Sequence, residues 1–177
     1  LGPLSQRDLA VAFKGLGVPQ LSLDPGEVAT TPDTAALVRE SCAVTDAFLP
    51  SELEVRLLCG DVDVRAAAEE LASWGPPVVA IKGGAAGCLL YERDANRFTT
   101  IPAYPARVVD VTGAGDSFCG GFSAGLRRTG DPLRAALMGT VSASFTVEGY
   151  GALYTLGASR HEAERRLEAL AGATTRI

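Results

Sequence analysis

Strand-like and helical segments alternate along most of the 177-residue chain, and this alternation limits the possible folds more than any other feature. The alanine-rich helical stretch Val64 to Ser73, for example, is stopped by Trp74-Gly75-Pro76-Pro77 and followed by the β-branched run Val78 to Ile81. Such alternation is typical of βαβ units around a mainly parallel sheet flanked by helices. No repeat, low-complexity tract or linker interrupts it, so we predict a single α/β domain over residues 1–177.

Hydrophobic periodicity, turn residues and capping signals set the expected bounds of the elements. Helices are expected over residues 6–15, 34–40, 51–58, 64–73, 116–128 and 132–147, and onward from the capping box of Ser159 and Glu162. Strands are expected over residues 20–23, 78–81, 88–91 and 98–101, within 43–49, and at 108–109. The strands at 88–91 and 98–101 follow a glycine cluster, and we expect them to be an antiparallel addition to the parallel sheet.

The composition excludes several classes of function. The formal net charge of −5 leaves no basic face for a polyanion, so a nucleic-acid partner is not expected. No apolar run reaches the roughly 18 residues of a membrane helix, and we expect a cytoplasmic protein with no membrane partner. The four cysteines are widely spaced and the chain has one histidine. A zinc site, a disulfide framework and a histidine-dependent hydrolase are therefore not expected either.

The segment with the clearest chemistry runs from Asp110 to Phe122, where a strand end, the turn Gly113-Ala114-Gly115 and a helix start follow one another. At such a junction the backbone N–H groups and the positive end of the helix dipole point at one spot, which favours a phosphate. Asp116 then lies in the first helical turn, where it either orients and deprotonates an attacking hydroxyl or only caps the helix. Phe118 stands where a dinucleotide-binding G-x-G-x-x-G needs its third glycine, and the chain has no P-loop.

The longer string from Asp110 to Phe118 resembles the C-terminal signature D-T-x-G-A-G-D-x-F of the ribokinase-like, or PfkB, family of sugar and nucleoside kinases. Val111 in place of the family's threonine is a small departure. The resemblance implies a ribokinase-like fold and ATP-dependent transfer of the γ-phosphate to a hydroxyl of a small sugar or related polyol. It also implies Asp116 as the catalytic base and the amides of Gly113-Ala114-Gly115 as the anion hole. A monovalent cation, K⁺, is implied near Asp110 and Thr112.

Two flanking segments resemble the nucleotide-binding elements of the family. The stretch from Ile81 to Gly87 looks like the strand and glycine turn that pass along the nucleotide, which implies contacts from Lys82, Gly83, Gly84 and Gly87. The helix from Ala135 to Val147, together with Gly149-Tyr150-Gly151-Ala152, looks like the adenine-side wall, which implies Thr140 and Ser144, although many relatives carry asparagine at the first of these positions. From the residues alone, Lys82 could equally be a surface lysine, and Gly149 and Gly151 a helix C-cap and turn.

A magnesium residue is implied after the strand that ends at Leu49-Pro50. The family usually places Asn-x-x-Glu there, with the glutamate acting on Mg²⁺ through water. This chain has Ser51-Glu52-Leu53-Glu54, so Glu54 takes that role and Ser51 replaces the asparagine. A capping box of Ser51 and Glu54 explains both residues without a metal, and this alternative stays open.

The resemblance covers nearly the whole chain, but only the nucleotide and catalytic-base part of the family. Nothing here corresponds to the family's N-terminal part and β-sheet lid, which supply most of the sugar recognition, and the sequence begins at Leu1. We therefore expect the C-terminal portion of a longer PfkB-type kinase, for which a homodimer is a further expectation. The alternative, suggested by Ser51 and by the missing part, is a non-catalytic nucleotide-binding or regulatory relative of the same fold.

Overall fold

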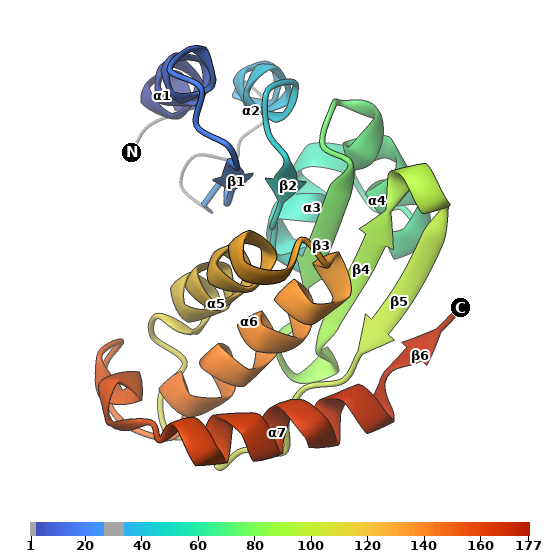
Figure 1. Cartoon of the computed structure of the whole chain (residues 1–177). Helices are drawn as coiled ribbons and strands as arrows, with labels where there is room; N and C mark the ends of the chain where they lie inside the picture. Colours follow the sequence, from blue (N-terminus) through green and yellow to red (C-terminus); the bar gives the residue numbers. More distant parts are fainter. Residues whose placement is uncertain (1–2, 27–33) are drawn as a thin grey trace. The chain divides into compact units, whose positions relative to one another are not determined.

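A computed structural model describes residues 3–26 and 34–177, and its elements confirm the predicted α/β class (Figure 1). The strands of the described residues are β1 Ser22–Leu23, β2 Ala47–Phe48, β3 Val78–Lys82, β4 Cys88–Glu92, β5 Arg97–Ile101 and β6 Thr175–Arg176. The α-helices are α1 Pro3–Gly15, α2 Ala35–Cys42, α3 Glu52–Cys59, α4 Val64–Ser73, α5 Ala114–Thr129, α6 Pro132–Thr146 and α7 Arg160–Ala173. Short 3-10 helices are η2 Gly84–Ala86, η3 Arg93–Ala95 and η4 Tyr154–Gly157.

The strands form one mixed sheet in the order β1-β2-β3-β4-β5-β6. The strands β1, β2 and β3 pair in parallel, with Ser22 opposite Ala47 and Phe48 opposite Val79. Figure 1 draws β4 and β5 running in opposite directions, and β5 pairs antiparallel with β6. The predicted parallel sheet with an antiparallel addition is thereby confirmed.

The chain divides into two compact units. The first unit comprises Leu1–Lys82 and Tyr91–Phe98, and the second comprises Gly83–Leu90 and Thr99–Ile177. The chain passes between the units after β3, within β4 and again within β5. A single domain over residues 1–177 stays a prediction.

The core of the first unit forms where helices cover the parallel strands. Phe48, Val79 and Ile81 are fully or almost fully buried. Helix α4 packs on β3 and buries the small side chains of Ala68 and Ala72, a stripe at i and i+4 that lets a helix approach a sheet closely. This packing fixes the carboxyl ends of β1, β2 and β3 at one edge.

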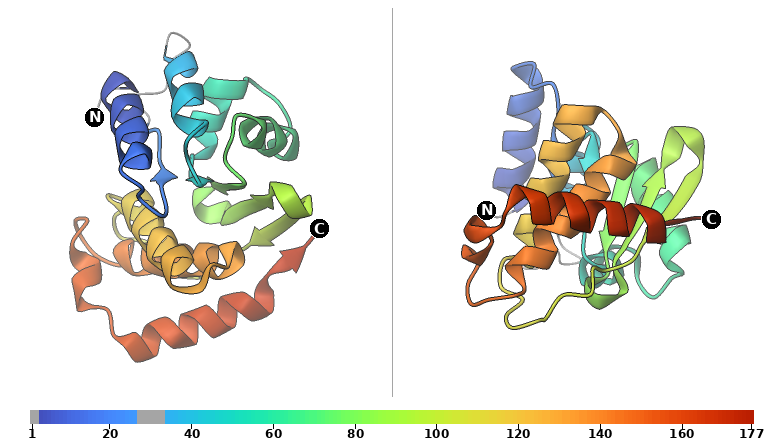
Figure 2. Two further views of the ribbon diagram at one scale, coloured as in Figure 1. Left: turned by 45° about the horizontal axis from the view of Figure 1, so that its top comes forward. Right: turned by 60° about the horizontal axis from the view of Figure 1, so that its bottom comes forward.

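The second unit is built on three helices. Helix α5 packs along α6 and buries Phe118 and Phe122, whose ring centroids lie 6.1 Å apart. Helix α7 packs against α6, and Figure 2 shows it lying outside the α5–α6 pair. Asp131 caps α6 by accepting the Leu133 N–H at 2.9 Å, and Pro132 takes the first helical position as predicted.

The predicted strand at residues 108–109 is wrong. The N–H groups of Val109 and Asp110 both donate to the Val147 carbonyl, at 2.7 and 3.3 Å, so the segment is tied to the end of α6 and joins no sheet. Val108 is exposed on this segment. Two β-branched residues favour an extended backbone, but they do not provide a strand partner.

The last helix also differs from its prediction in one detail. Ser159 accepts the Glu162 N–H at 3.1 Å, but the Glu162 carboxylate binds Arg165 and Arg166 instead of returning to Ser159. Only half of the expected capping box is therefore formed. Strand β6 was not predicted, because its two residues are too few to give a periodic pattern. Leu1 and Gly2 lie outside the described residues.

Candidate active site

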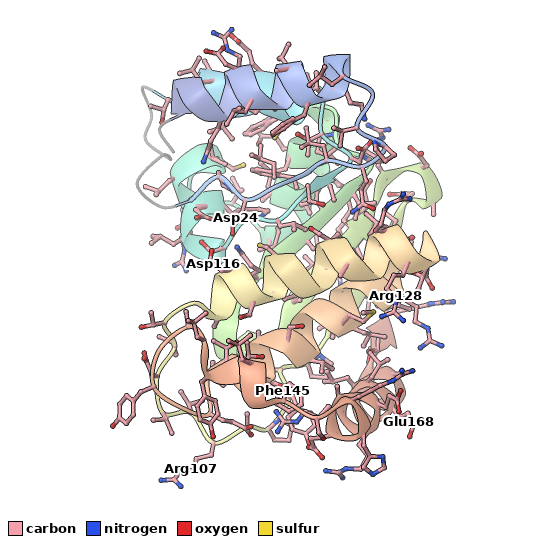
Figure 3. The ribbon with its side chains drawn as sticks, turned by 60° about the vertical axis from the view of Figure 1, so that its left-hand side comes forward. Asp24, Arg107, Asp116, Arg128, Phe145 and Glu168 are labelled. Carbon is pink, nitrogen blue, oxygen red and sulfur yellow. The ribbon has the colours of Figure 1, made fainter. Side chains whose placement is uncertain are left out.

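Asp116 lies in the first turn of α5, where its side chain is exposed (Figure 3). The helix begins at Ala114, two residues earlier than expected, because Gly113 is the N-cap and its carbonyl accepts the Ser117 N–H at 2.9 Å. Gly113 has no side chain with which to satisfy the free amides of the first turn. The helix start therefore combines an exposed carboxylate with unsatisfied N–H donors.

The amides of this turn are not all equally available. The Ala114 N–H donates to the Val111 carbonyl at 3.1 Å, so it already has a partner within the turn. The N–H groups of Gly113, Gly115 and Asp116 have no acceptor among the described residues. Of the three amides expected to form an anion hole, those of Gly113 and Gly115 thus remain open, and the Asp116 amide adds a donor that the sequence pattern did not single out.

Gly113 is required by the shape of the turn. Its φ of +78° is in the left-handed region, and a Cβ built on it would lie 2.5 Å from the Ala152 Cβ. The turn therefore fits against the loop that follows α6. Neither a side chain nor an ordinary backbone conformation is tolerated at this position.

We expect Gly113→Ala to destabilise the protein by about 1–2 kcal/mol from the left-handed conformation alone, with the Ala152 contact adding to the loss. Gly120→Ala is the matched control, because Gly120 lies inside α5 and a Cβ added there would meet no atom within 4 Å. Alanine there should be neutral or stabilising by up to about 1 kcal/mol. Denaturant unfolding of the two variants measures the difference, and equal stabilities would contradict the assigned turn geometry.

Asp110 ties the glycine turn to the loop after α6. One carboxylate oxygen accepts the Thr112 N–H at 3.0 Å and the Thr112 hydroxyl at 2.8 Å, and the other accepts the Gly151 N–H at 2.9 Å. These bonds, with that from Gly151 the strongest influence, lower the pKa of Asp110. The predicted cation residues Asp110 and Thr112 are thus in direct contact with each other.

The lowered pKa of Asp110 predicts an acid-sensitive contribution to stability. The contribution is present above the ordinary carboxyl pKa of about 3.9 and is lost as the pH falls through the lower folded-state value. The stability difference between wild type and Asp110→Asn should therefore be larger at neutral pH than in acid, as measured by urea unfolding across this range. Glu168→Gln, at an exposed carboxylate on α7 of the same unit, is the control for the general effect of removing one negative charge. A pH-independent difference for Asp110→Asn would show that the hydrogen bonds of the ionised Asp110 carboxylate to Thr112 and Gly151 do not stabilise the protein.

The predicted nucleotide turn is a closed glycine loop. The Gly83 N–H donates to the Gly87 carbonyl at 2.8 Å, and η2 with Gly84 lies between them. Gly87 has a φ of +93°, and a Cβ built on it would overlap the Ile101 carbonyl oxygen. Glycine is therefore required at this end of the loop, where the Ile101 backbone approaches closely.

The two residues predicted on the adenine side are buried. The Thr140 hydroxyl donates to the Ala136 carbonyl at 3.0 Å, and the Ser144 hydroxyl donates to the Val141 carbonyl at 2.7 Å. The Arg166 guanidinium also donates to Ser144 Oγ at 2.9 Å. Both hydroxyls are thus already bonded within the second unit.

Lys82 and Glu54 both lie in the first unit. The sequence pattern did not indicate a further charged residue there, Asp24. The Lys82 ammonium forms an ion pair with Asp24, which the sequence indicates only as part of a turn. The Lys82 side chain is 13% exposed, so it is not a surface lysine. Asp24 and Lys82 each lie at the carboxyl end of a parallel strand, and such ends meet at one edge of a sheet. The sequence could have indicated their pairing only if the order of the strands had been known.

Ser51 and Glu54 form the capping box that was left open as an alternative. The Glu54 N–H donates to Ser51 Oγ at 3.3 Å, and the Ser51 N–H donates to Glu54 Oε2 at 2.6 Å. Glu54 is 4% exposed, and this burial raises its pKa against the opposing effect of the Ser51 N–H. A carboxylate in such a position needs cationic or N–H groups nearby; the Ser51 N–H is one, and the charge of Lys82 also favours the ionised form.

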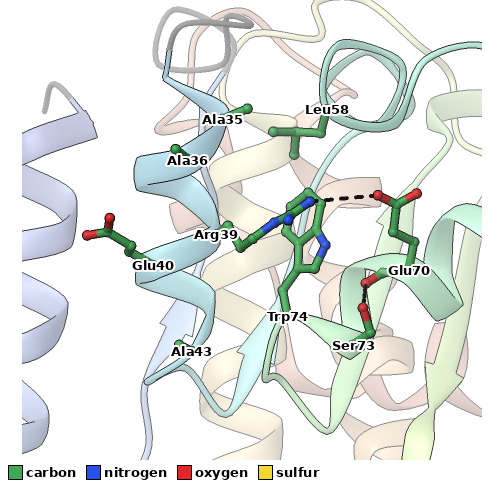
Figure 4. Close-up of a pocket in the computed structure, with 9 residues that line it drawn as sticks. All are labelled: Ala35, Ala36, Arg39, Glu40, Ala43, Leu58, Glu70, Ser73 and Trp74. Atoms are coloured by element: carbon green, nitrogen blue, oxygen red, sulfur yellow. Dashed lines mark hydrogen bonds and ion pairs between the residues drawn. The ribbon is translucent and has the colours of Figure 1, made fainter.

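A cavity of about 860 Å³ lies elsewhere in the first unit (Figure 4). The Arg39 guanidinium covers the Trp74 ring at 4.6 Å from its centroid and lies 4.0 Å from the Glu70 carboxylate. The cavity is lined by Ala35, Ala36, Arg39, Glu40, Ala43, Leu58, Glu70, Ser73 and Trp74. It contains no residue that the sequence predicted for the site.

Two kinds of feature are absent from the residues that the structure describes. Within residues 3–26 and 34–177, no three or more His, Cys, Asp or Glu side chains gather as a metal cluster. None of the helices in this part of the chain combines the length and the apolar character that a membrane crossing needs.

Comparison with known proteins places this geometry in a family. Residues 18–157 match the pfkB family carbohydrate kinase. The chain is 40% identical over 97 residues to the cytidine kinase of Thermococcus kodakarensis, covering 55% of this chain and 34% of that protein. It is 35% identical over 111 residues to the deoxyribokinase of Salmonella typhi, covering 60% of this chain and 36% of that protein.

A solved structure supports the same placement. The structure of a candidate ribokinase II from E. coli, in complex with ATP and Mg²⁺, superimposes with a TM-score of 0.75 at 29% identity, covering 90% of this chain and 52% of that one. The predicted ribokinase-like fold is thereby confirmed. The chain spans about a third of the length of the two curated relatives and about half of the solved chain.

Proposed function

Because the chain belongs to the pfkB family of carbohydrate kinases, we propose that it supplies the nucleotide-binding and catalytic-base part of an ATP-dependent kinase. The acceptor is a hydroxyl of a small sugar or related polyol. The observation that carries the proposal is the exposed Asp116 carboxylate in the first turn of α5, next to open amides. A cytoplasmic location follows from this function, since the substrates ATP and phosphorylatable sugars are found there.

Asp116 is proposed as the base of the transfer. It accepts the proton of the acceptor hydroxyl as the oxygen attacks the γ-phosphorus, while the bond between that phosphorus and the β,γ-bridging oxygen breaks and ADP leaves. The amides of Gly113, Gly115 and Asp116 hold the negative charge of the transferring group. The Ala114 amide supports the turn through Val111 instead.

Nucleotide contacts are proposed for the glycine loop and for α6. The backbone of Gly83, Gly84 and Gly87 passes along the nucleotide, and Lys82 contacts its phosphates. Thr140 and Ser144 shape the wall of α6 from within, because their hydroxyls are bonded inside the unit.

The carboxylates of the first unit could bind Mg²⁺ only together with the phosphates of a nucleotide. The described residues offer no cluster of three ligands, whereas Mg²⁺ is usually bound through one or two carboxylates, several waters and substrate phosphates. We propose Glu54 as the carboxylate, acting through water. The ion would neutralise the charge that builds up on the phosphates.

We expect K⁺ to raise the activity of the protein that contains this chain, relative to Na⁺ or Li⁺. A cation beside Asp110 and Thr112 would stiffen the turn that precedes Asp116, since the Asp110 carboxylate already joins that turn to Gly151. Initial rates in the three chloride salts at equal ionic strength provide the measurement. Equal rates in all three would remove the cation from the proposal.

The direct test is a coupled assay of ADP formation by the protein that contains this chain, with ATP, Mg²⁺ and a panel of pentoses, hexoses, polyols and nucleosides. ADP release that depends on one acceptor class supports the kinase and identifies its substrate. The rival is a non-catalytic nucleotide-binding or regulatory relative, which the complete capping box of Ser51 and Glu54 favours because it gives both residues a structural role. Tight ATP binding without acceptor-dependent turnover would support that rival.

A further inference from the structure

A hydrogen bond between side chains joins α5 to α6 directly beside the proposed base. The Thr146 hydroxyl donates to Ser117 Oγ at 2.6 Å. Ser117 follows Asp116 in the chain, and its N–H donates to the Gly113 carbonyl, which closes the first turn of the helix. Thr146 is the last residue of α6 and is fully buried. The end of α6 is thus bonded to the helical turn that carries Asp116.

The Thr146 hydroxyl has a second acceptor, because its oxygen also lies 3.2 Å from the Ser142 carbonyl oxygen. A hydroxyl has one proton to donate and accepts through its lone pairs. When Thr146 donates to Ser142, the Ser117 hydroxyl can donate to Thr146 in turn, and the two hydroxyl oxygens remain bonded. The contact of 2.6 Å is therefore satisfied in either arrangement, and Thr146→Val would remove it in both.

The two helices approach closely enough for this bond because glycine lies at their contact, and Figure 1 shows them side by side. Cβ atoms built on Gly121 of α5 and on Gly139 of α6 would lie 2.4 and 2.8 Å from atoms of the opposite helix. Neither helix has room for a side chain at these positions, so close packing sets their spacing. The bond between Ser117 and Thr146 lies where α5 begins and α6 ends.

Asp116 depends on this bond because few other contacts hold the first turn of α5. The N-cap Gly113 has no side chain, and the amides of Gly115 and Asp116 have no acceptor among the described residues. The Asp116 carboxylate itself forms no hydrogen bond or ion pair within residues 3–26 and 34–177. It is therefore placed by the backbone of its turn and not by partners of its own.

We propose that Ser117 and Thr146 are positioning residues, whose hydrogen bond fixes the first turn of α5 and so places the Asp116 carboxylate within reach of the acceptor hydroxyl. A general base must lie within hydrogen-bond distance of the proton that it takes, and a displacement of about 1 Å costs up to about a hundredfold in rate. Neither hydroxyl touches the reacting atoms in this role, since both act through Asp116. The inference rests on the proposed function of Asp116.

The test removes either hydroxyl from the protein that contains this chain. Thr146→Val keeps the shape of the side chain, and Ser117→Ala removes the partner oxygen while Thr146 keeps the Ser142 carbonyl as its acceptor. In steady-state kinetics, we expect each variant to lower kcat about ten- to a hundredfold with the KM for ATP nearly unchanged. The double variant should lose no more than either single one, because both changes remove the same bond. Thr146→Ser keeps the hydroxyl and should restore kcat.

Two controls separate positioning from a general loss of stability. Thr45→Val removes another buried hydroxyl, which donates to the Ser41 carbonyl at 2.7 Å in the first unit, and should leave kcat unchanged. In the Asp116→Asn background, Thr146→Val should lower kcat by no more than about twofold, because no base is left to misplace. If Thr146→Val fails to fold, Ser117→Ala, at a half-buried position, takes its place in both comparisons.

Amide hydrogen exchange provides a measurement that needs no turnover. The Ser117 N–H is bonded to the Gly113 carbonyl, so it exchanges when the first turn of α5 opens. Thr146→Val should speed this exchange about two- to tenfold, the range that the loss of one hydrogen bond implies. Thr45→Val should leave it unchanged.

Wild-type kcat in folded Thr146→Val and Ser117→Ala, or an undiminished loss in the Asp116→Asn background, would overturn the inference while leaving the kinase proposal intact. If the wild-type protein phosphorylates no acceptor, the kinase proposal fails, and exchange of the Ser117 amide decides the inference. Faster exchange in Thr146→Val would then uphold the fixing of the Asp116 turn, and unchanged exchange would overturn it.

Discussion

In the protein that contains this chain, replacement of the proposed base Asp116 by asparagine is expected to lower kcat by about two to four orders of magnitude, the usual contribution of a general base. Asparagine has the size of aspartate and can still accept a hydrogen bond at a helix start, but it cannot take the proton of an attacking hydroxyl. The loss therefore falls on the transition state, and ATP binding should be kept or slightly strengthened, because a negative charge next to the phosphates is removed. Steady-state kinetics and calorimetric ATP titration measure the two quantities separately.

Asp131→Asn is the matched control for this experiment. Asp131 caps α6 through the Leu133 N–H and is exposed, so the same substitution there changes a helix cap without touching the glycine turn. Its kcat should equal that of the wild type. If folded Asp116→Asn retained more than about a tenth of the wild-type kcat, well above what loss of a general base implies, Asp116 would be only a cap and the kinase mechanism would lose its base.

Arg166→Ala is expected to cost about 3 kcal/mol of folding free energy, the lower end of the range for breaking a buried ion pair. The Arg166 side chain is 7% exposed, and its guanidinium binds both oxygens of Glu148 and one of Glu162 while lying 3.9 Å from the Phe145 ring centroid. Alanine removes the cation, and the two carboxylates remain close together. They are partly exposed, and for this reason the lower end of the range applies.

Arg160→Ala on the same helix provides the comparison. The Arg160 side chain is 89% exposed and pairs only with Glu164 one turn away among the described contacts, so its loss should cost far less folding free energy than the loss of Arg166. Urea unfolding of both variants, followed by helix circular dichroism, gives the two values. Similar losses for Arg160 and Arg166 would show that the buried cluster does not stabilise the unit.

Local sequence signals predicted most of the helices and the position of Asp116. Helix α4 spans the predicted residues, since Asp63 caps its start and Trp74-Gly75-Pro76 prevents its continuation. The capping box of Ser51 and Glu54 and the Pro132 start of α6 follow the same logic, because each depends on residues within one helical turn. Asp116 is in the first turn of α5 for the same reason, because the helix begins directly after Gly113, three residues before Asp116.

Contacts between distant residues could not be predicted in this way. The Asp24–Lys82 pair joins residues 58 apart, and the sequence around Asp24 indicates only a turn. Helix α6 presented a different difficulty, since it buries residues on every side, from Ala135 to Thr146. Without an apolar stripe, the pattern cannot tell whether Thr140 and Ser144 face a ligand or the protein.

The bond between Asp110 and Gly151, which are 41 residues apart, has a consequence for how the protein folds. The glycine turn cannot close on its final partner until α5 and α6 have formed and packed, because both helices lie between the two residues. Closure of such a chain segment comes late, after its entropy has been offset by the intervening contacts. A nascent or partly refolded molecule would therefore have its helices before it has a finished phosphate-binding turn, and amide hydrogen exchange at Gly151 would become protected later than in either helix.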